Sequence, residues 1–190
     1  MNKTNLLALL FIIGFLSCKN AEKKKGTLEI AKKYYEVLAE SNTFEIAPLL
    51  TDSLVTRETQ YDYEQVFALN EYIAWLQWDS QFDPTYNILH MEEVGETVQA
   101  KISKIDTRIS FLHGEPIVTN QIIRFDKDKI SSIETTEYVV FNDSLFVGNR
   151  DQLVRWVDEN HPELNGFIHD QTKVGAINYL KAMELYKNKD

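Results

Sequence analysis

Four polar residues lie in strand-like, apolar stretches in the second half of the chain and are candidates for chemistry: His90, Arg108, Gln121 and Glu137. Histidine has an ordinary pKa near neutrality, and a carboxylate or an arginine beside it completes an acid–base or carboxylate-binding set. If these four residues share one concave surface, His90 is the base, and Arg108 or Glu137 is its partner. The alternative is a surface role for each residue. Arg108 would then form a solvent-facing ion pair with Asp106, two positions before it.

Aromatic residues form a second candidate set. Tyr72, Trp75 and Trp78 are spaced to share one side of a helix, and Tyr34 and Tyr35 lie on an earlier helical segment. Such residues can line an apolar cavity, or they can form the core between helices and a sheet. The predicted ligand contacts are Tyr34, Tyr72, Trp75, Trp78 and Gln121.

Composition excludes several classes of function. The chain has 20 Lys and Arg against 29 Asp and Glu, a formal net charge of −9, which disfavours a nucleic-acid partner. Its single cysteine excludes a disulfide framework and a cysteine-rich metal site. His161 and His169 have no acidic partner at ligand spacing, and the seven glycines form no phosphate-binding loop. We therefore expect no metal and no cofactor.

Near the start of the sequence, the positively charged Lys3 is followed by an apolar run over residues 6–16. Eleven residues rise about 16 Å as a helix, which is too short to span a bilayer but typical of a secretion signal. A buried helix and a cleaved signal without a lipid are the alternatives. Residues 19–26 are polar and end in Gly26, as in a flexible tether with three lysines near lipid headgroups or in solvent.

Helical periodicity covers 28–40, 43–50 and 64–78, with a short strand over 54–59 before the last of these. The period then changes to two over four strand-like runs: 85–91, 97–111, 116–125 and 130–141. Their short connections predict an antiparallel meander. The alternation in the second run changes phase, which predicts a β-bulge near residues 103–105. Two further helices are expected over 151–160 and 172–186.

Two stretches resemble known families. Residues 15–18 (FLSC) resemble the lipobox of bacterial lipoproteins, which ends in a small residue and an obligatory cysteine. That resemblance implies cleavage before Cys18, a diacylglyceryl thioether on its sulfur and acylation of the new amine. Several acyl chains together make a lasting membrane anchor. Because Lys19 follows the cysteine, the resemblance implies the periplasmic side of the outer membrane.

The helices and the meander resemble the nuclear transport factor 2-like superfamily. The resemblance rests on residues 31–38 (AKKYYEVL), 44–52 (FEIAPLLTD) and 128–134 (DKISSIE). It implies an α+β cone in which three N-terminal helices pack on a curved, mostly antiparallel sheet around a pocket. The expected division is a signal peptide at 1–17, the lipidated cysteine and tether at 18–26, the cone at 27–141 and a helical extension at 142–190.

The superfamily includes SnoaL-like cyclases, ketosteroid isomerases and dehydratases, as well as binding modules without chemistry. The sequence favours a non-catalytic, membrane-anchored envelope lipoprotein that binds a small apolar or amphipathic ligand or an envelope protein. One alternative is a SnoaL-like isomerase, cyclase or hydratase that uses His90 with Arg108 or Glu137. Another is a structural module whose pocket is filled by its own side chains. A homodimer through the sheet is a further expectation.

Overall fold

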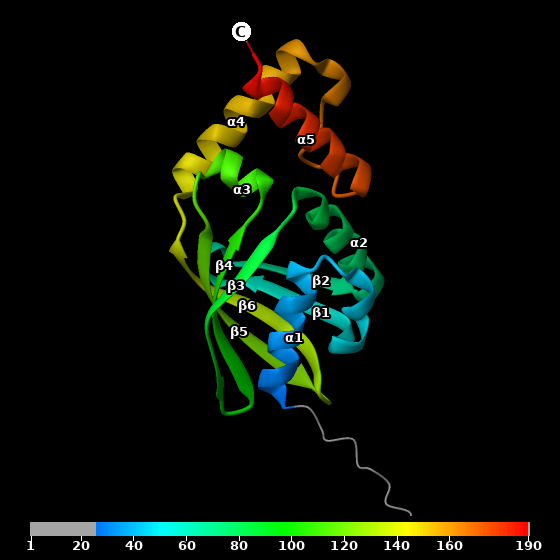
Figure 1. The fold of residues 1–190 in the computed structure, drawn as a ribbon, viewed down its shortest axis with the longest axis vertical. Helices are drawn as coiled ribbons and strands as arrows, with labels where there is room; N and C mark the ends of the chain where they lie inside the picture. The colour runs from blue at the N-terminus through cyan, green and yellow to red at the C-terminus, as the bar shows by residue number, and fades with distance from the viewer. Residues whose placement is uncertain (1–25, 190) are drawn as a thin grey trace, which may run out of the picture.

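Helix α1 (Thr27–Ala39) lies across the concave face of a curved six-stranded sheet in the computed structural model, which describes residues 26–189 (Figure 1). Its buried positions, Ile30, Ala31, Tyr34, Tyr35, Val37 and Leu38, recur at intervals of three and four residues. That spacing gives the helix one apolar face, which it buries against the sheet. The helix predicted over 28–40 is confirmed, whereas Cys18, the predicted lipidation site, lies outside the described residues.

The sheet has the strand order β2-β1-β6-β5-β4-β3. The strands are β1 (Leu50–Glu58), β2 (Tyr63–Ala68), β3 (Thr85–Val94), β4 (Thr97–Ile105), β5 (Ile117–Asp126) and β6 (Lys129–Val140). Strands β3 to β6 form the predicted antiparallel meander, and β1 joins it by pairing parallel with β6. The fold class predicted from the sequence is confirmed: an α+β fold with a mostly antiparallel sheet.

The helix predicted over 64–78 is two elements. Residues 63–68 form β2, which pairs with β1 from Ser53↔Ala68 to Glu58↔Tyr63, and α2 (Leu69–Asp79) follows. The Glu71 carboxylate accepts a hydrogen bond from the Ala68 N–H at 2.9 Å, which fixes the start of α2. The prediction was wrong over 64–68 because strand pairing with β1 overrides a local helical pattern.

The second predicted helix, 43–50, is two short 3₁₀ turns, η1 (Thr43–Glu45) and η2 (Ala47–Leu49). Pro48 has no N–H to donate within a helix, and Leu50 already begins β1 opposite Ile130. The cone therefore has two N-terminal α-helices rather than three among the described residues.

The long strand predicted over 97–111 ends at Ile105. Asp106 is extended, and its Oδ1 accepts the N–H of Ile109 at 2.5 Å, which starts the short helix α3 (Thr107–Leu112). The bulge predicted near 103–105 is also wrong, because β4 pairs with β5 in unbroken register from Thr97 to Lys104. The change of phase marks the strand-to-helix transition instead.

The C-terminal residues form α4 (Asp143–Asn160) and α5 (Lys173–Lys187), which gather with α3 at one end of the sheet (Figure 1). Helix α4 begins before the predicted Asp151 because Asn142 Oδ1 caps the Leu145 N–H at 3.0 Å. The start of α4 is held by the buried His113, whose Nε2 accepts the N–H of Asn142 at 2.8 Å. Asn149 Nδ2 donates to the carbonyl of Leu112 at 2.8 Å, which joins α4 to α3.

Two apolar clusters meet at α2. One joins α1 to the inner face of the sheet, with Leu54, Ile102 and Ile123 fully or almost fully buried. The other joins the end of α2 and the turn η4 (Ser80–Phe82) to α3, α4 and α5. Trp75 packs against both clusters, so the C-terminal helices are part of the same folded body. None of the helices within residues 26–189 is long and apolar enough to cross a membrane.

Gly175 tests the docking of α5. A Cβ atom there would lie 1.9 Å from the Asp170 carbonyl oxygen, whereas a Cβ at Gly148 in α4 would meet nothing within 4 Å. We expect Gly175→Ala to lower the free energy of unfolding by about 1–3 kcal/mol, because backbone must move. The matched Gly148→Ala should raise it by about 0.5–1 kcal/mol, because alanine favours a helix interior. Urea unfolding measures both, and equal effects would contradict this packing.

Candidate functional site

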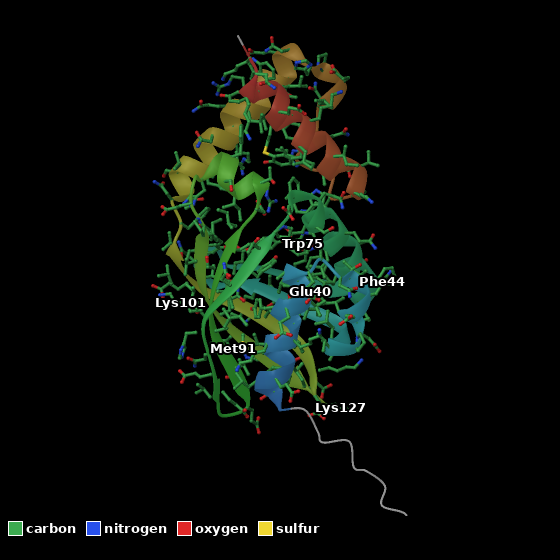
Figure 2. All side chains as sticks on the ribbon, viewed as in Figure 1. Glu40, Phe44, Trp75, Met91, Lys101 and Lys127 are labelled. Carbon is green, nitrogen blue, oxygen red and sulfur yellow. The ribbon has the colours of Figure 1, made fainter. Side chains whose placement is uncertain are left out.

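A cavity of about 440 Å³ lies between the inner face of the sheet, α1, α2 and the C-terminal segment. Its walls are aromatic and apolar, with contributions from Phe67, Trp75, Ile102 and Ile133. Figure 2 places Trp75 between α2 and the C-terminal helices, where the two apolar clusters meet. Phe146 of α4 and Gln171 before α5 complete the lining. A cavity of this size and character suits a small ligand.

The five residues predicted to contact a ligand all line this cavity. They are Tyr34 on α1, Tyr72, Trp75 and Trp78 on α2, and Gln121 on β5. The ring planes of Tyr72 and Trp75 are stacked at 5.7 Å, which gives the α2 wall a continuous aromatic surface. Their role as ligand contacts stays a prediction.

The tyrosine hydroxyls of α1 have partners within the protein. Tyr34 and Tyr72 share a hydrogen bond, and Tyr35 donates to Gln121 Oε1. Burial raises the pKa of Tyr34, Tyr35 and Tyr72, so these hydroxyls are neutral at physiological pH. This side of the cavity is uncharged and already hydrogen-bonded.

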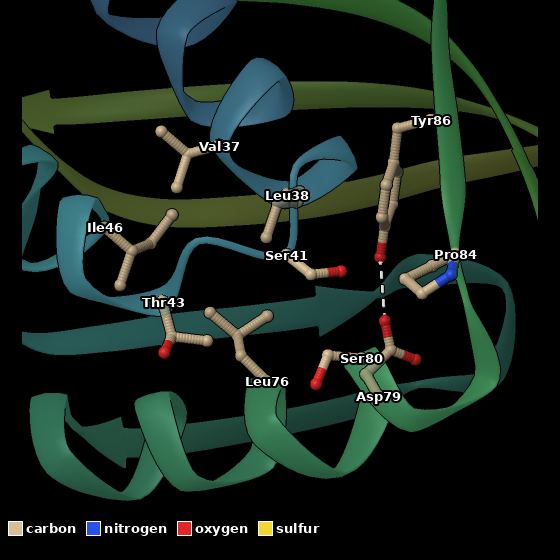
Figure 3. Close-up of a pocket in the computed structure, with 10 residues that line it drawn as sticks. All are labelled: Val37, Leu38, Ser41, Thr43, Ile46, Leu76, Asp79, Ser80, Pro84 and Tyr86. Carbon is tan, nitrogen blue, oxygen red and sulfur yellow. Dashed lines mark hydrogen bonds between the residues drawn. The ribbon is translucent and has the colours of Figure 1, made fainter.

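Charged residues gather at the end of the cavity nearest α3. Lys104 Nζ contacts both carboxylate oxygens of Asp79, at 2.7 and 2.8 Å, although only 2% of the Asp79 side chain is exposed. Tyr86 donates to Asp79 Oδ2 at 3.1 Å (Figure 3). Burial and the Asp79 charge raise the pKa of Tyr86, which keeps it a donor. Asp79 therefore has a close cation and a hydroxyl donor.

A narrow pocket beside Asp79 and Tyr86 is not a second ligand site. It runs between the end of α1 and α2, and Figure 3 shows Val37, Leu38, Ile46 and Leu76 closing around it. Its volume is about 10 Å³, close to that of one water-sized probe. The cavity of about 440 Å³, by contrast, has room for an organic molecule.

Arg108 also lines the large cavity at its charged end. Its guanidinium carbon lies 4.8 Å from the ring centre of Trp78 and 5.0 Å from that of Phe82. Arg108 Nη2 is 3.5 Å from Asp106 Oδ2 and 3.8 Å from Asp79 Oδ1, which are long for hydrogen-bonded ion pairs. Arg108 Nε and Trp78 Nε1 are both buried and have no hydrogen-bond partner.

The end of the cavity beside β1 holds a carboxylate. Tyr138 on β6 donates to Glu58 Oε2 on β1 at 2.7 Å, and both residues line the cavity. Burial and this hydrogen bond to Glu58 raise the pKa of Tyr138. Arg57 lines the same end, but it is exposed and paired with Glu64. A carboxylate with a tyrosine donor is an arrangement that could accept a proton from a bound molecule.

The predicted catalytic set is not assembled. His90 lies on the edge strand β3, its side chain is 63% exposed, and its Nε2 is 3.5 Å from Glu92 Oε1. Glu137 is exposed on β6 and accepts a hydrogen bond from Asn120 at 2.7 Å. Of the three residues, Arg108 alone lines the cavity.

Two structural features explain why His90 and Arg108 lie elsewhere than the sequence predicted. A register shift between Ile88 and His90 sets His90 opposite Lys101 rather than opposite the inward-facing Ala100. The expected solvent-facing pair of Asp106 and Arg108 is wrong because α3 turns both residues inward, which leaves their side chains 0% and 19% exposed. One pattern in the sequence could have identified Lys104 as a residue of the site. Lys104 continues the buried alternation of Val98, Ala100 and Ile102.

No group of three residues able to hold a metal ion is found in the part of the chain that the structure describes.

No protein-family model matches the chain, and no curated protein matches it. Solved structures do resemble it. One named as a candidate ketosteroid isomerase, from Kribbella flavida, superposes with a TM-score of 0.51 at 15% identity, over 61% of this chain and 80% of that one. An uncharacterized cystatin-fold protein from Novosphingobium aromaticivorans gives 0.50 at 16% identity, over 60% of this chain and 99% of that one. An NTF2-like protein of unknown function from Cytophaga hutchinsonii gives 0.48 at 13% identity, over 60% and 90%.

The curved sheet around α1 and the likeness to the Kribbella protein define the fold. It is nuclear transport factor 2-like, with a helical C-terminal extension that contributes to the cavity. At these identities the likeness concerns the fold alone, and one fold carries many functions.

Proposed function

We propose that the protein is a lipid-anchored envelope protein that binds a small amphipathic molecule in the cavity. The observation that carries this proposal is the cavity itself. Its volume of about 440 Å³ is bounded by aromatic side chains and has a charged end at Lys104 and Arg108. A molecule with an apolar body and a polar end matches both features, because apolar surface is buried against the walls and the polar end meets unpaired donors.

Two features favour a small ligand over a protein partner docked on the sheet. Beside Val118 and Ile122, the side chains that point away from α1 include Gln99, Lys101, Asn120 and Arg124, so polar and charged groups are interspersed over this face. Protein interfaces are instead depleted of charge at their core. The inner face of the sheet has both the space and the apolar surface that a small ligand requires. A structural module with a filled pocket is likewise disfavoured by the volume of the cavity.

Filling the cavity tests the proposal. Thr135 lines it opposite Gln121, whereas the neighbouring Thr136 does not. We expect Thr135→Phe to lower the amount of co-purified small molecule about tenfold, because the added ring takes up ligand space. Thr136→Phe is the matched control and should retain it. Mass spectrometry of extracts from the natively purified protein gives the amounts. Equal amounts from both variants would place the molecule elsewhere, and none from wild type would contradict the proposal.

Proton transfer is a second candidate function, and one observation favours it. Glu58 lines the cavity with Tyr138 hydrogen-bonded to it, so a carboxylate faces the space where a ligand would lie. In this alternative, an isomerase, cyclase or hydratase uses Glu58 as the proton acceptor in place of the exposed His90.

Solvent exchange tests the second candidate. When the wild-type protein is incubated in D₂O with its extracted small-molecule fraction, we expect deuterium at a carbon of the ligand. Glu58→Gln keeps an acceptor for Tyr138 but removes the base, so exchange should fall by about 100-fold or more. The control Glu64→Gln changes a carboxylate that does not line the cavity. Mass spectrometry measures the deuterium incorporated into the ligand. Equal incorporation with the wild type and with Glu58→Gln would exclude Glu58 as the proton acceptor.

The proposed attachment to the membrane depends on lipidation of Cys18. We expect Cys18→Ser to leave the protein unprocessed or to release it from the membrane fraction, because the acyl chains have no sulfur to join. The matched Ser17→Ala keeps a small residue before the cysteine and should be processed normally. Intact mass and membrane fractionation report both results. Normal processing with full membrane retention in Cys18→Ser would refute the anchor.

A further inference from the structure

Resting on the proposed ligand-binding function, we propose that the ligand is a monocarboxylate with an apolar body and that Arg108 and Trp78 hold its carboxylate. The inference names the chemical class of the ligand and its orientation, with the carboxylate at the α3 end of the cavity. It starts from the hydrogen-bond donors that the protein leaves unpaired.

The acidic residues near Arg108 are already engaged. Lys104 and Tyr86 contact the Asp79 carboxylate at 2.7 to 3.1 Å. Asp106 gives Oδ1 to the backbone of α3, and its Oδ2 lies 3.7 Å from Lys104 and 3.5 Å from Arg108. Arg108 has five N–H donors, and its shortest ion-pair distance is this 3.5 Å contact. Its contacts with Asp106 and Asp79 are both made by Nη2, so the Nε donor of this mostly buried cation has no partner.

Among residues 26–189, three buried side-chain polar atoms have no hydrogen-bond partner, and two of them belong to side chains that line the cavity. These two are Arg108 Nε and Trp78 Nε1, and Trp78 is only 4% exposed. The guanidinium lies 4.8 Å from the indole ring centre, so stacking uses its face and leaves its edge for hydrogen bonds. A carboxylate has two oxygens and about four acceptor sites, which can serve an arginine edge and an indole N–H together.

The other lining residues of the cavity determine which chemical groups can accompany the carboxylate of the ligand. Tyr72, Trp75 and Phe67 offer aromatic surface to an apolar body. Glu58 lines the cavity on the β1 side and would repel a second carboxylate there. A small inorganic anion would leave the aromatic walls without contacts, and a dicarboxylate would meet Glu58. The lining therefore favours a single acid group on an apolar molecule.

The test compares two probes of nearly the same shape, 4-butylbenzoate and 4-butylbenzamide. Isothermal titration calorimetry would use the full-length wild-type protein in lipid nanodiscs, with empty nanodiscs as the blank. We expect the acid to bind about tenfold or more tightly than the amide, since only the acid carries a charge for Arg108. In Arg108→Gln this preference should disappear. Arg124→Gln is the matched control, an arginine that does not line the cavity and is paired with Glu134, and it should keep the preference.

The outcomes separate the two proposals. Equal binding of acid and amide by wild type would overturn the carboxylate inference and leave ligand binding in place. Failure to bind either probe would count against both. Acid preference that survives in Arg108→Gln would overturn the assignment to Arg108. Should Arg108→Gln fail to fold, as judged by near-UV circular dichroism, Arg108→Lys keeps the charge but loses the planar fork. It should bind the acid more weakly than wild type does, and unchanged affinity would again overturn the assignment.

Discussion

The contact between Lys104 and Asp79 is the interaction on which the rest of the site depends. It joins the end of α2 to the end of β4 in a place where only 2% of Asp79 is exposed. Losing one member of a buried ion pair costs about 3–5 kcal/mol, because the other charge is left without compensation. The pair therefore fixes the positions of α2 and β4 at the charged end of the cavity. While Asp79 is engaged by Lys104, Arg108 Nη2 lies 3.5 Å from Asp106 and 3.8 Å from Asp79, and Arg108 Nε has no hydrogen-bond partner.

The C-terminal helices have a role in the cavity as well as in the core. The sheet and α1 make a cone, and α3, α4 and α5 gather at one end of it (Figure 1). Phe146 and Gln171 come from this extension and line the cavity. The buried His113 and Asn149 hold α4 to α3 through hydrogen bonds at 2.8 Å. The extension thus gives the nuclear transport factor 2-like cone part of the lining of its cavity.

The local pattern of residue types in the sequence was sufficient to predict much of the fold and part of the candidate site. Runs of Ile, Val and Thr separated by turn residues predicted the meander, and helical spacing placed Tyr34, Tyr72 and Trp75 on faces that line the cavity. Two features depend on long-range pairing and could not be predicted. Residues 63–68 became a strand because β1 lies beside them, and His90 turned outward because β3 shifts register before it. The meeting of Asp79 with Lys104 depends on how α2 packs against the sheet, which no local period encodes.

A crystal structure of the protein saturated with 4-butylbenzoate tests the account most directly. We predict the benzoate ring against Tyr72 and Trp75, with a carboxylate oxygen about 3 Å from Arg108 Nε and the Lys104–Asp79 contact unchanged. The account would be contradicted if the probe lay outside the cavity, or if it lay inside with its acid group pointing toward Glu58. It would equally be contradicted if side chains closed the space and left no room for the ring.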